Sequence, residues 1–414
     1  MKKLRVTAAA ISAGLILLQN TLSFAAPMSL SLQESINLAL QNNPSIQIVG
    51  KDKEQSEWGV SEAKAGRMPT VSLGSNYNFQ NGGQNSNSLR MNWQVYSGGR
   101  TDAKINQAEL GVVGADLDLE KTKQQVILDT TTDYYNVLEA KNMVEVNEQT
   151  VNNLTAHLNI VQAKYDAGVV AKVDLLRSEV ELANAKQNLI KAQNQYELAV
   201  TELLNTINID ADTELNLDGE LAYQADQRTL ADAIDQAKQN RPEIAKAKIS
   251  IESAEQGIKA AKSGKLPSIS MSASTGWNDS LLPDSSNDWS VGLSASWNVF
   301  DAGVTKAQTN QAKASLDKVK LQAEQTQDVV EQEVRESYLG MKEAEKRLET
   351  TEVTVNKANE DLYIAQERYK AGVGTNLDLI DAQLALTQAK TNHIQALYDY
   401  NVNKAKLDKA TGVK

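Results

Sequence analysis

Apolar and polar residues alternate along four short segments of the chain. Two of these segments lie between residues 68 and 98, and two lie between residues 267 and 300. Their apolar positions are, in turn, Val71, Leu73, Tyr77 and Phe79; Leu89, Met91, Trp93 and Val95; Ile269, Met271 and Ala273; and Trp289, Val291, Leu293, Ala295, Trp297 and Val299. A period of two over about ten residues indicates strands with two unlike faces. We therefore predict β-hairpins at 68–98 and 267–300.

These predicted strands have features of membrane strands. Tryptophan stands near the strand ends, and the loops are rich in Asn, Gly, Ser and Asp, as in transmembrane β-barrel hairpins. A soluble sheet with one buried face alternates in a similar way. Four strands are fewer than the smallest closed barrel needs. If the strands enter a membrane, several copies of the chain must therefore share one barrel.

Apolar residues recur every three or four positions through most of the remaining chain, which predicts long helices. We expect a helix at 99–165 with a return helix at 172–206, and a second pair at 303–370 and 376–410. Shorter helices are expected at about 45–66 and 243–264. The first long helix carries two apolar seams, so it should have two neighbours. Periodicity alone favours a solid coiled-coil bundle over a helical tube.

The chain is an internal duplication. Asn42-Asn43-Pro44 returns as Asn240-Arg241-Pro242, and Trp93 to Tyr96 returns as Trp297 to Phe300. The repeating unit of about two hundred residues is too long for a solenoid repeat and predicts pseudo-symmetry within the chain. We assign the first repeat to 26–206, a polar and irregular linker that begins the second repeat to 207–240, and the second repeat to 241–414.

The first 25 residues are typical of a secretory signal peptide. Lys2, Lys3 and Arg5 precede an apolar run that is too short to span a bilayer, and Ser23-Phe24-Ala25 is a small-x-small cleavage site. Export favours the membrane interpretation of the strands. The net charge of −11 argues against nucleic-acid binding. Without cysteine and with only two histidines, His157 and His393, the chain offers no thiolate or evident histidine metal site, and we expect no cofactor.

The motifs together resemble the TolC-like outer-membrane channel family. The resemblance rests on the opening Leu30 to Ile36 with Asn42-Asn43-Pro44, the proline before each hairpin, the Gly98-Gly99 and Ala302-Gly303 helix starts, and two Tyr-x-x-Gly…Asp-Leu motifs. It implies a homotrimer in the outer membrane. Its twelve strands would close one β-barrel in outer-membrane lipid, and its twelve helices would continue that barrel as a periplasmic α-barrel. This architecture replaces the solid bundle that periodicity favours.

The resemblance also implies a function. The chain would be a passive exit duct, not an enzyme, in a tripartite efflux pump or a type I secretion system. Its partners would be a periplasmic adaptor protein and an inner-membrane transporter. A periplasmic coiled-coil adaptor or scaffold is the alternative, but that function leaves the four amphipathic strands unexplained. A hydrolase is a further alternative, for which the carboxylates form no convergent constellation.

The two helix-turn-helix tips are the candidate site. Gly168 and Gly372 would end the long helices, and we expect them, with Leu175 and Leu379, to contact the adaptor. The resemblance implies that Asp174, Tyr369, Asp378 and Asp381 control an acidic entrance. Asp174 and Asp378 are equally explained as ordinary first-turn residues of helices, whereas Asp381 lies one turn further on. We expect rings of Asp378 and Asp381 to bind cations that block the pore. Tyr369 would bond to a neighbouring helix, with Asp174 within reach, but Gly374 occupies the position where the family carries an arginine.

Overall fold

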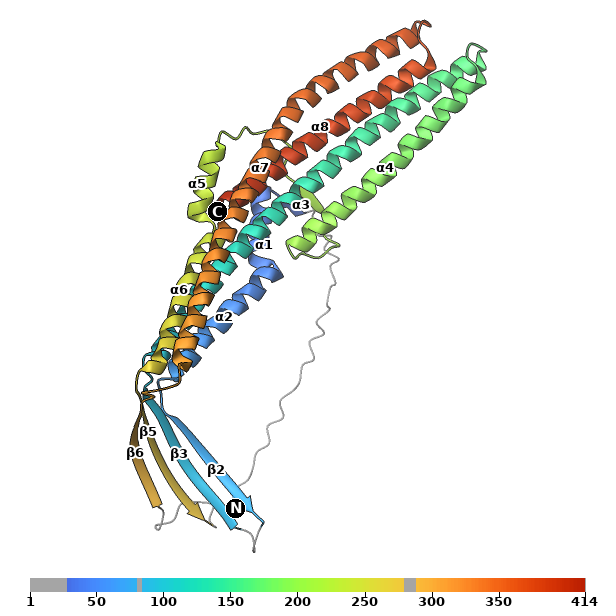
Figure 1. Cartoon of the computed structure of the whole chain (residues 1–414). Coiled ribbons are helices and arrows are strands. Elements are labelled where there is room, and N and C mark those ends of the chain that lie inside the picture. The colour runs from blue at the N-terminus through green and yellow to red at the C-terminus, as the bar shows by residue number, and fades with distance from the viewer. Residues whose placement is uncertain (1–27, 80–83, 279–287, 414) are drawn as a thin grey trace, which may run out of the picture.

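The computed structural model describes residues 28–79, 84–278 and 288–413. The predicted signal peptide at 1–25 lies outside these residues. The described chain consists of a four-stranded sheet at one end and a layer of long helices that extends away from it (Figure 1). Two helical hairpins form the opposite end.

Each of the two longest helices, α3 (Arg100–Asp166) and α7 (Val304–Lys370), contains 67 residues. At 1.5 Å per residue each is about 100 Å long. Both are free of proline and rich in strong helix formers, so nothing in their interiors interrupts the backbone hydrogen bonds. Their return helices are α4 (Lys172–Thr206) and α8 (Asn376–Thr411). The predicted bounds of all four helices are confirmed to within one residue.

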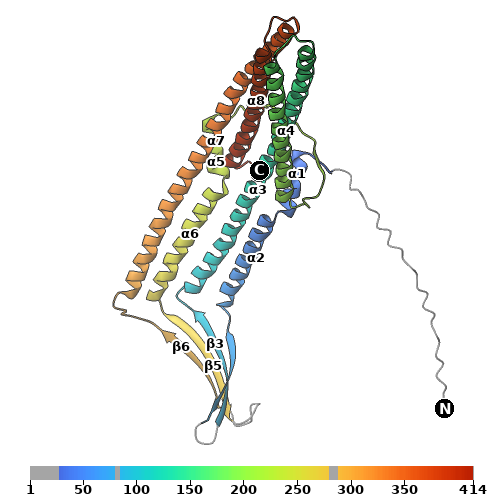
Figure 2. The ribbon, with the colours of Figure 1, turned by 90° about the vertical axis from the view of Figure 1, so that its right-hand side faces the viewer.

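The helices form a curved layer, so the solid bundle favoured by periodicity is wrong. Near the sheet, α2 (Pro44–Ala65), α3, α6 (Pro242–Lys262) and α7 lie side by side (Figure 2). Toward the tips, α4 packs on α3, α3 on α8, and α8 on α7. The helix α3 therefore has a neighbour on either side along its whole length, as its two apolar seams predicted. None of the described helices has an apolar stretch long enough to cross a membrane.

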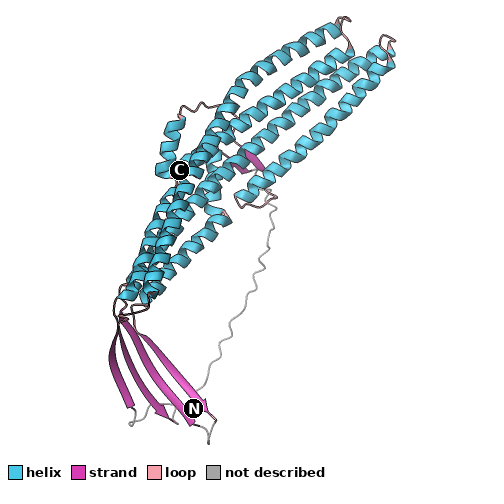
Figure 3. Ribbon diagram, viewed as in Figure 1, coloured by secondary structure: helices cyan, strands magenta, loops and turns pink. Residues whose placement is uncertain are grey.

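The sheet contains four antiparallel strands in the order β2, β3, β5, β6 (Figure 3). They span β2 (Thr70–Asn78), β3 (Gln84–Tyr96), β5 (Ser268–Asn278) and β6 (Asp288–Ser296). The strand β6 ends earlier than predicted, so Trp297 and Val299 lie beyond it. Trp297 instead donates its indole N–H to the carbonyl of Lys265 (3.0 Å), as Trp93 does to the carbonyl of Arg67 (2.7 Å). The two repeats thus anchor their hairpins by the same contact.

The register gives the sheet one apolar and one polar face. Residues directly opposite one another on paired strands share a face. One row across the four strands is Val71, Met91, Ala273 and Val291, and the adjacent row is Ser72, Arg90, Ser274 and Ser290. The apolar face is uncovered in the chain: Leu73 is 71% exposed and Leu293 is 73% exposed.

Several short elements lie against the middle of the helical layer (Figure 1). The strand β1 (Met28–Leu30) pairs in parallel with β4 (Leu215–Leu217). The linker at 207–240 is less irregular than predicted, because its last residues form the helix α5 (Leu230–Asn240), the counterpart of α1 (Leu32–Asn42). Both helices begin with a capping box, Ser31 with Glu34 and Thr229 with Asp232. The main apolar cores lie at this level, around Leu203, Leu204 and Ile207 in the first repeat and around Val334, Met341 and Tyr400 in the second.

Candidate functional site

Both long helices end in the same Schellman motif at the tips. Gly168 (φ +73°) and Gly372 (φ +76°) adopt the left-handed conformation that glycine tolerates best. The N–H of Val169 donates to the carbonyl of Lys164 (2.8 Å), and the N–H of Val373 donates to that of Arg368 (3.0 Å). Glycine is therefore needed at both positions to reverse the chain. The predicted helix ends at Gly168 and Gly372 are confirmed.

The return helices begin differently in the two repeats. Thr375 caps α8: its hydroxyl accepts from the N–H of Asp378 (3.1 Å), and the Asp378 carboxylate accepts from the N–H of Thr375 (3.1 Å). This backbone hydrogen bond is the main reason that the pKa of Asp378 is lowered. Ala171 begins α4 without a side-chain cap, so Asp174 has no such partner. In the single chain, Asp378 thus acts as a helix cap.

Asp378 and Asp381 line one side of a shallow hollow of about 390 Å³ between α7 and α8. Asp361 and Arg368 line the other side. The charge of Arg368 contributes to the lowered pKa of Asp378. Sequence reasoning missed Arg368, although it precedes Tyr369 directly. The structure therefore brings the two predicted carboxylates together and adds a cation beside them, while Asp174 lies outside this hollow.

The position of Gly374 is tightly packed in this loop conformation. A Cβ atom there would lie 3.1 Å from both the Cβ of Arg368 and the backbone nitrogen of Tyr369. The N–H of Gly374 donates to the carbonyl of Arg368 (3.0 Å) and so holds the loop against the last turn of α7. A side chain at position 374 would therefore require the last turn of α7 or the loop to shift slightly.

Tyr369 lies inside a small apolar core at the tips, with Val161, Leu175 and Leu379. The ammonium of Lys164 lies 3.9 Å from the centre of its ring. Burial, and then the charge of Asp174, raise the pKa of Tyr369. Its buried hydroxyl has no hydrogen-bond partner among the described residues, so the expected contact with Asp174 is not made within the chain.

Leu175 and Leu379 do not offer the exposed adaptor contact that the sequence predicted. They are 7% and 6% exposed, because their side chains fill the core that links the two hairpins. The tips expose other apolar side chains near the two glycines: Val169, Val173, Leu176, Val373 and Leu377.

A buried polar network, which sequence reasoning missed, joins the two hairpins. The Nε2 atom of His157 on α3 lies 2.6 Å from the Oδ1 atom of Asn376 on α8. Asn376 also donates to the carbonyl of Asp174 (3.0 Å) and to the hydroxyl of Ser178 (3.2 Å) on α4. Burial lowers the pKa of His157, the bond to Asn376 opposes this shift, and the charge of Lys164 reinforces it. Its partner lies 219 residues away along the chain, so no local pattern reveals it.

The polar contacts continue away from the tips along the seam between α3 and α8. Asn153 donates to Gln383 (3.0 Å), and the hydroxyls of Thr150 and Thr387 lie 2.8 Å apart. The seam within each hairpin is apolar by contrast, with Leu154 against Leu182 in the first and Leu362 against Leu386 in the second. Each hairpin is thus held internally by apolar packing, whereas the two hairpins are joined by these hydrogen bonds together with the apolar core at the tips.

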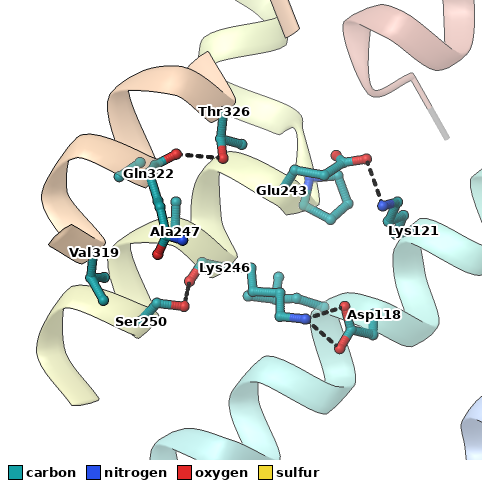
Figure 4. Close-up of a pocket in the computed structure, with 12 residues that line it drawn as sticks. Asp118, Lys121, Glu243, Lys246, Ala247, Ser250, Val319, Gln322 and Thr326 are labelled. Carbon is teal, nitrogen blue, oxygen red and sulfur yellow. Dashed lines mark hydrogen bonds and ion pairs between the residues drawn. The ribbon is translucent and has the colours of Figure 1, made fainter. Parts of the chain in front are cut away.

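A second hollow, of about 480 Å³, lies between α3, α6 and α7 (Figure 4). Its charged residues are paired: Lys246 contacts both carboxylate oxygens of Asp118 (2.7 Å each), and Lys121 lies 3.8 Å from Glu243. These pairs join α3 to α6. We assign the hollow a structural role.

The sequence of the chain matches the model of a known family. The match to the "Outer membrane efflux protein" model covers residues 35–208 and 233–413, which is most of the chain. The chain belongs to the outer membrane efflux protein family. This membership favours an outer-membrane efflux channel over the alternatives of a periplasmic adaptor and a hydrolase.

Individual relatives cover nearly the same extent. The chain is 25% identical to the outer membrane protein TolC of Escherichia coli K12 over 419 residues, which covers 94% of this chain and 85% of TolC. It is 26% identical over 329 residues to the probable efflux pump outer membrane protein TtgC of Pseudomonas putida, covering 76% and 66% of the two chains. The solved structure of the outer-membrane channel OprN has a TM-score of 0.81 at 20% identity and covers 92% of this chain and 90% of its own. The fold described above is therefore that of this channel.

Proposed function

We propose that this protein is an outer-membrane exit duct that passively conducts substrates from an inner-membrane transporter and its periplasmic adaptor to the outside. It would serve a tripartite efflux pump or a type I secretion system. The observation that carries the proposal is the four-stranded sheet, apolar on one face and polar on the other, at the end of a helical layer about 100 Å long. Membership of the efflux family supports the same function.

The apolar face suits lipid. In a membrane barrel, apolar side chains face outward and polar ones face the lumen. The outward row would hold Val71, Met91, Ala273 and Val291, while serines and Arg90 would line the lumen. An uncovered apolar face this large is otherwise unfavourable in water.

A homotrimer accounts for the open edges of the chain. Within the described residues, β2 and β6 are each paired on one side only. The edge helices carry exposed apolar residues, Val180 and Ile190 on α4, and Val353 and Tyr363 on α7. When the α7 edge of one copy meets the α4 edge of the next, the contact is heterologous, and repetition closes a ring. Three copies give a barrel of twelve strands in the known size range.

The helix tips would form the periplasmic entrance. The exposed Val169, Val173, Val373 and Leu377 lie where an adaptor can approach from the periplasm. Three copies would also gather the Asp378 and Asp381 carboxylates around the axis, and divalent cations would then bind and block the pore. Replacing both by asparagine should weaken cation block in planar bilayers. Unchanged block would reduce Asp378 to its capping role.

Arginine substitutions on the two faces of β6 test the proposed function. Leu293 lies on the apolar face and its neighbour Ser294 on the polar face. A lipid-facing arginine near the midplane costs about 2–4 kcal/mol, so Leu293→Arg should reduce the yield of membrane-inserted protein. Ser294→Arg should assemble normally and alter conductance. Equal yields for the two variants would contradict the assignment of the faces.

A further inference from the structure

The four strands of the sheet hold only two charged residues. They are Arg90 in the middle of β3 and Asp288 at the start of β6. All other residues on the polar face of these strands are serine, threonine, asparagine, glutamine or glycine. A charge in such surroundings has few local groups to offset it.

Arg90 stands among short side chains. The register places Ser72 and Ser274 directly opposite it on the two neighbouring strands. Along β3 itself, the next residues on the same face are Ser88 and Asn92. The side chain of Arg90 is exposed, and within the described residues it makes no hydrogen bond or ion pair. Its guanidinium is therefore free to extend above the polar surface.

Asp288 lies on the same face but is separated from Arg90. It pairs with Gly276, two rows nearer to the loops than the Arg90 row and two strands away. At about 4.8 Å between strands and about 3.4 Å per residue along them, the two charges cannot form a direct ion pair. Each therefore contributes to the field of the polar face separately.

We propose that Arg90 is a specificity-determining residue of the exit duct, where three copies form a positive ring that favours anionic solutes within the barrel. This inference rests on the proposed function, because it needs the polar face to line the lumen of a trimer. The ring opposes the cation preference expected from the Asp378 and Asp381 carboxylates at the other end of the duct. The duct would thus carry opposite charges at its two ends.

The size of the effect follows from Coulomb's law with salt screening. Three unit charges about 10 Å from the axis, in water at about 0.1 M salt, raise the local anion concentration about twofold and lower that of cations about twofold. The ratio of cation to anion permeability can therefore change by up to about fourfold when the ring is removed. At about 1 M salt the Debye length is near 3 Å, and the same ring changes either concentration by only about a tenth.

Reversal potentials in planar bilayers under a KCl gradient test this proposal. Arg90→Gln should raise the ratio of K⁺ to Cl⁻ permeability about two- to fourfold near 0.1 M salt and leave it almost unchanged near 1 M. Arg90→Lys keeps the charge and should keep the wild-type ratio. Asp288→Asn removes the opposite charge and should shift the ratio toward Cl⁻.

The outcomes separate this inference from the proposed function. Wild-type protein that forms no channel would contradict the proposed function itself. Channels in which Arg90→Gln has the wild-type permeability ratio near 0.1 M salt would overturn the role of Arg90 alone. If Arg90→Lys behaves like Arg90→Gln, side-chain shape and not charge is responsible, and the proposal fails as well.

Discussion

Replacing Asn376 by alanine should loosen the contact between the two hairpins at their tips. The substitution removes the partner of His157 Nε2 (2.6 Å) and the donor to the carbonyl of Asp174 (3.0 Å). Asn376 itself is 4% exposed, so the groups left behind are buried. A buried polar group without its partner costs about 1–3 kcal/mol, and entry of water recovers part of that cost.

We expect a loss of about 2 kcal/mol in local stability, which makes opening of the tips about thirtyfold more frequent. Because the affected contacts join α3, α4 and α8, the opening should separate the hairpins without unfolding either one. Hydrogen exchange followed by mass spectrometry should show faster exchange in peptides around His157 and Tyr369. Peptides around Leu203 and Met341, in the two main apolar cores, should exchange as in the wild type.

Asn392→Ala is the matched control. Asn392 lies on the same helix but is exposed, and among the described residues its side chain accepts a hydrogen bond only from Gln388 (2.8 Å), four residues earlier. Its replacement should change local stability by less than about 0.5 kcal/mol. Wild-type exchange at the tips of Asn376→Ala, or equal effects of the two substitutions, would refute the role of the buried network.

Three further predictions follow from the titratable and polar groups. Burial lowers the pKa of His157, so its neutral form stabilises the tips fully above about pH 6.5, and this stability is lost as the pH falls lower. Hydrogen exchange at the tips should therefore differ between about pH 5 and about pH 7.5 in the wild type, but much less in His157→Gln. Equal pH dependence of the two proteins would contradict this. The variant Tyr369→Phe should change the free energy of local opening at the tips, measured by hydrogen exchange, by less than about 0.5 kcal/mol, because the hydroxyl has no partner among the described residues. Faster exchange would indicate a partner on a neighbouring copy. Burial, and then the charge of Asp399, raise the pKa of Glu139 to about 7, so the ionised carboxylate costs stability as the pH rises above about 4.5. The variant Glu139→Gln should melt at a higher temperature than the wild type near pH 8 and at a similar temperature near pH 4. A lower melting temperature of the variant at pH 8 would contradict a destabilising charge on Glu139.

The elements were predictable because their signals are local. Helix bounds such as those of α3 and α7 follow from proline-free periodic sequence between glycines, and the strands follow from alternation. The end of β6 was predicted too late because alternation continues to Val299, whereas the ladder stops where β5 begins at Ser268. Pairing, and not sequence pattern, sets that end.

The packing of the tips was not predictable in the same way. The position of Asp378 at a helix start can be inferred from the sequence, but its capping partner Thr375 and the nearby Arg368 were overlooked. Leu175 and Leu379 were expected at the surface, and they are buried because the two hairpins pack against each other. The bond from His157 to Asn376 depends on the same long-range packing. Local pattern places a residue on a helix, but only the tertiary structure determines which face is covered.

The native mass of the detergent-extracted protein tests the central claim most directly. The proposed duct needs three copies to pair the free edges of β2 and β6 and to cover the apolar edges of α4 and α7. We predict a single species with the mass of three chains. A monodisperse species with the mass of one chain, and with its strands intact by circular dichroism, would contradict the account.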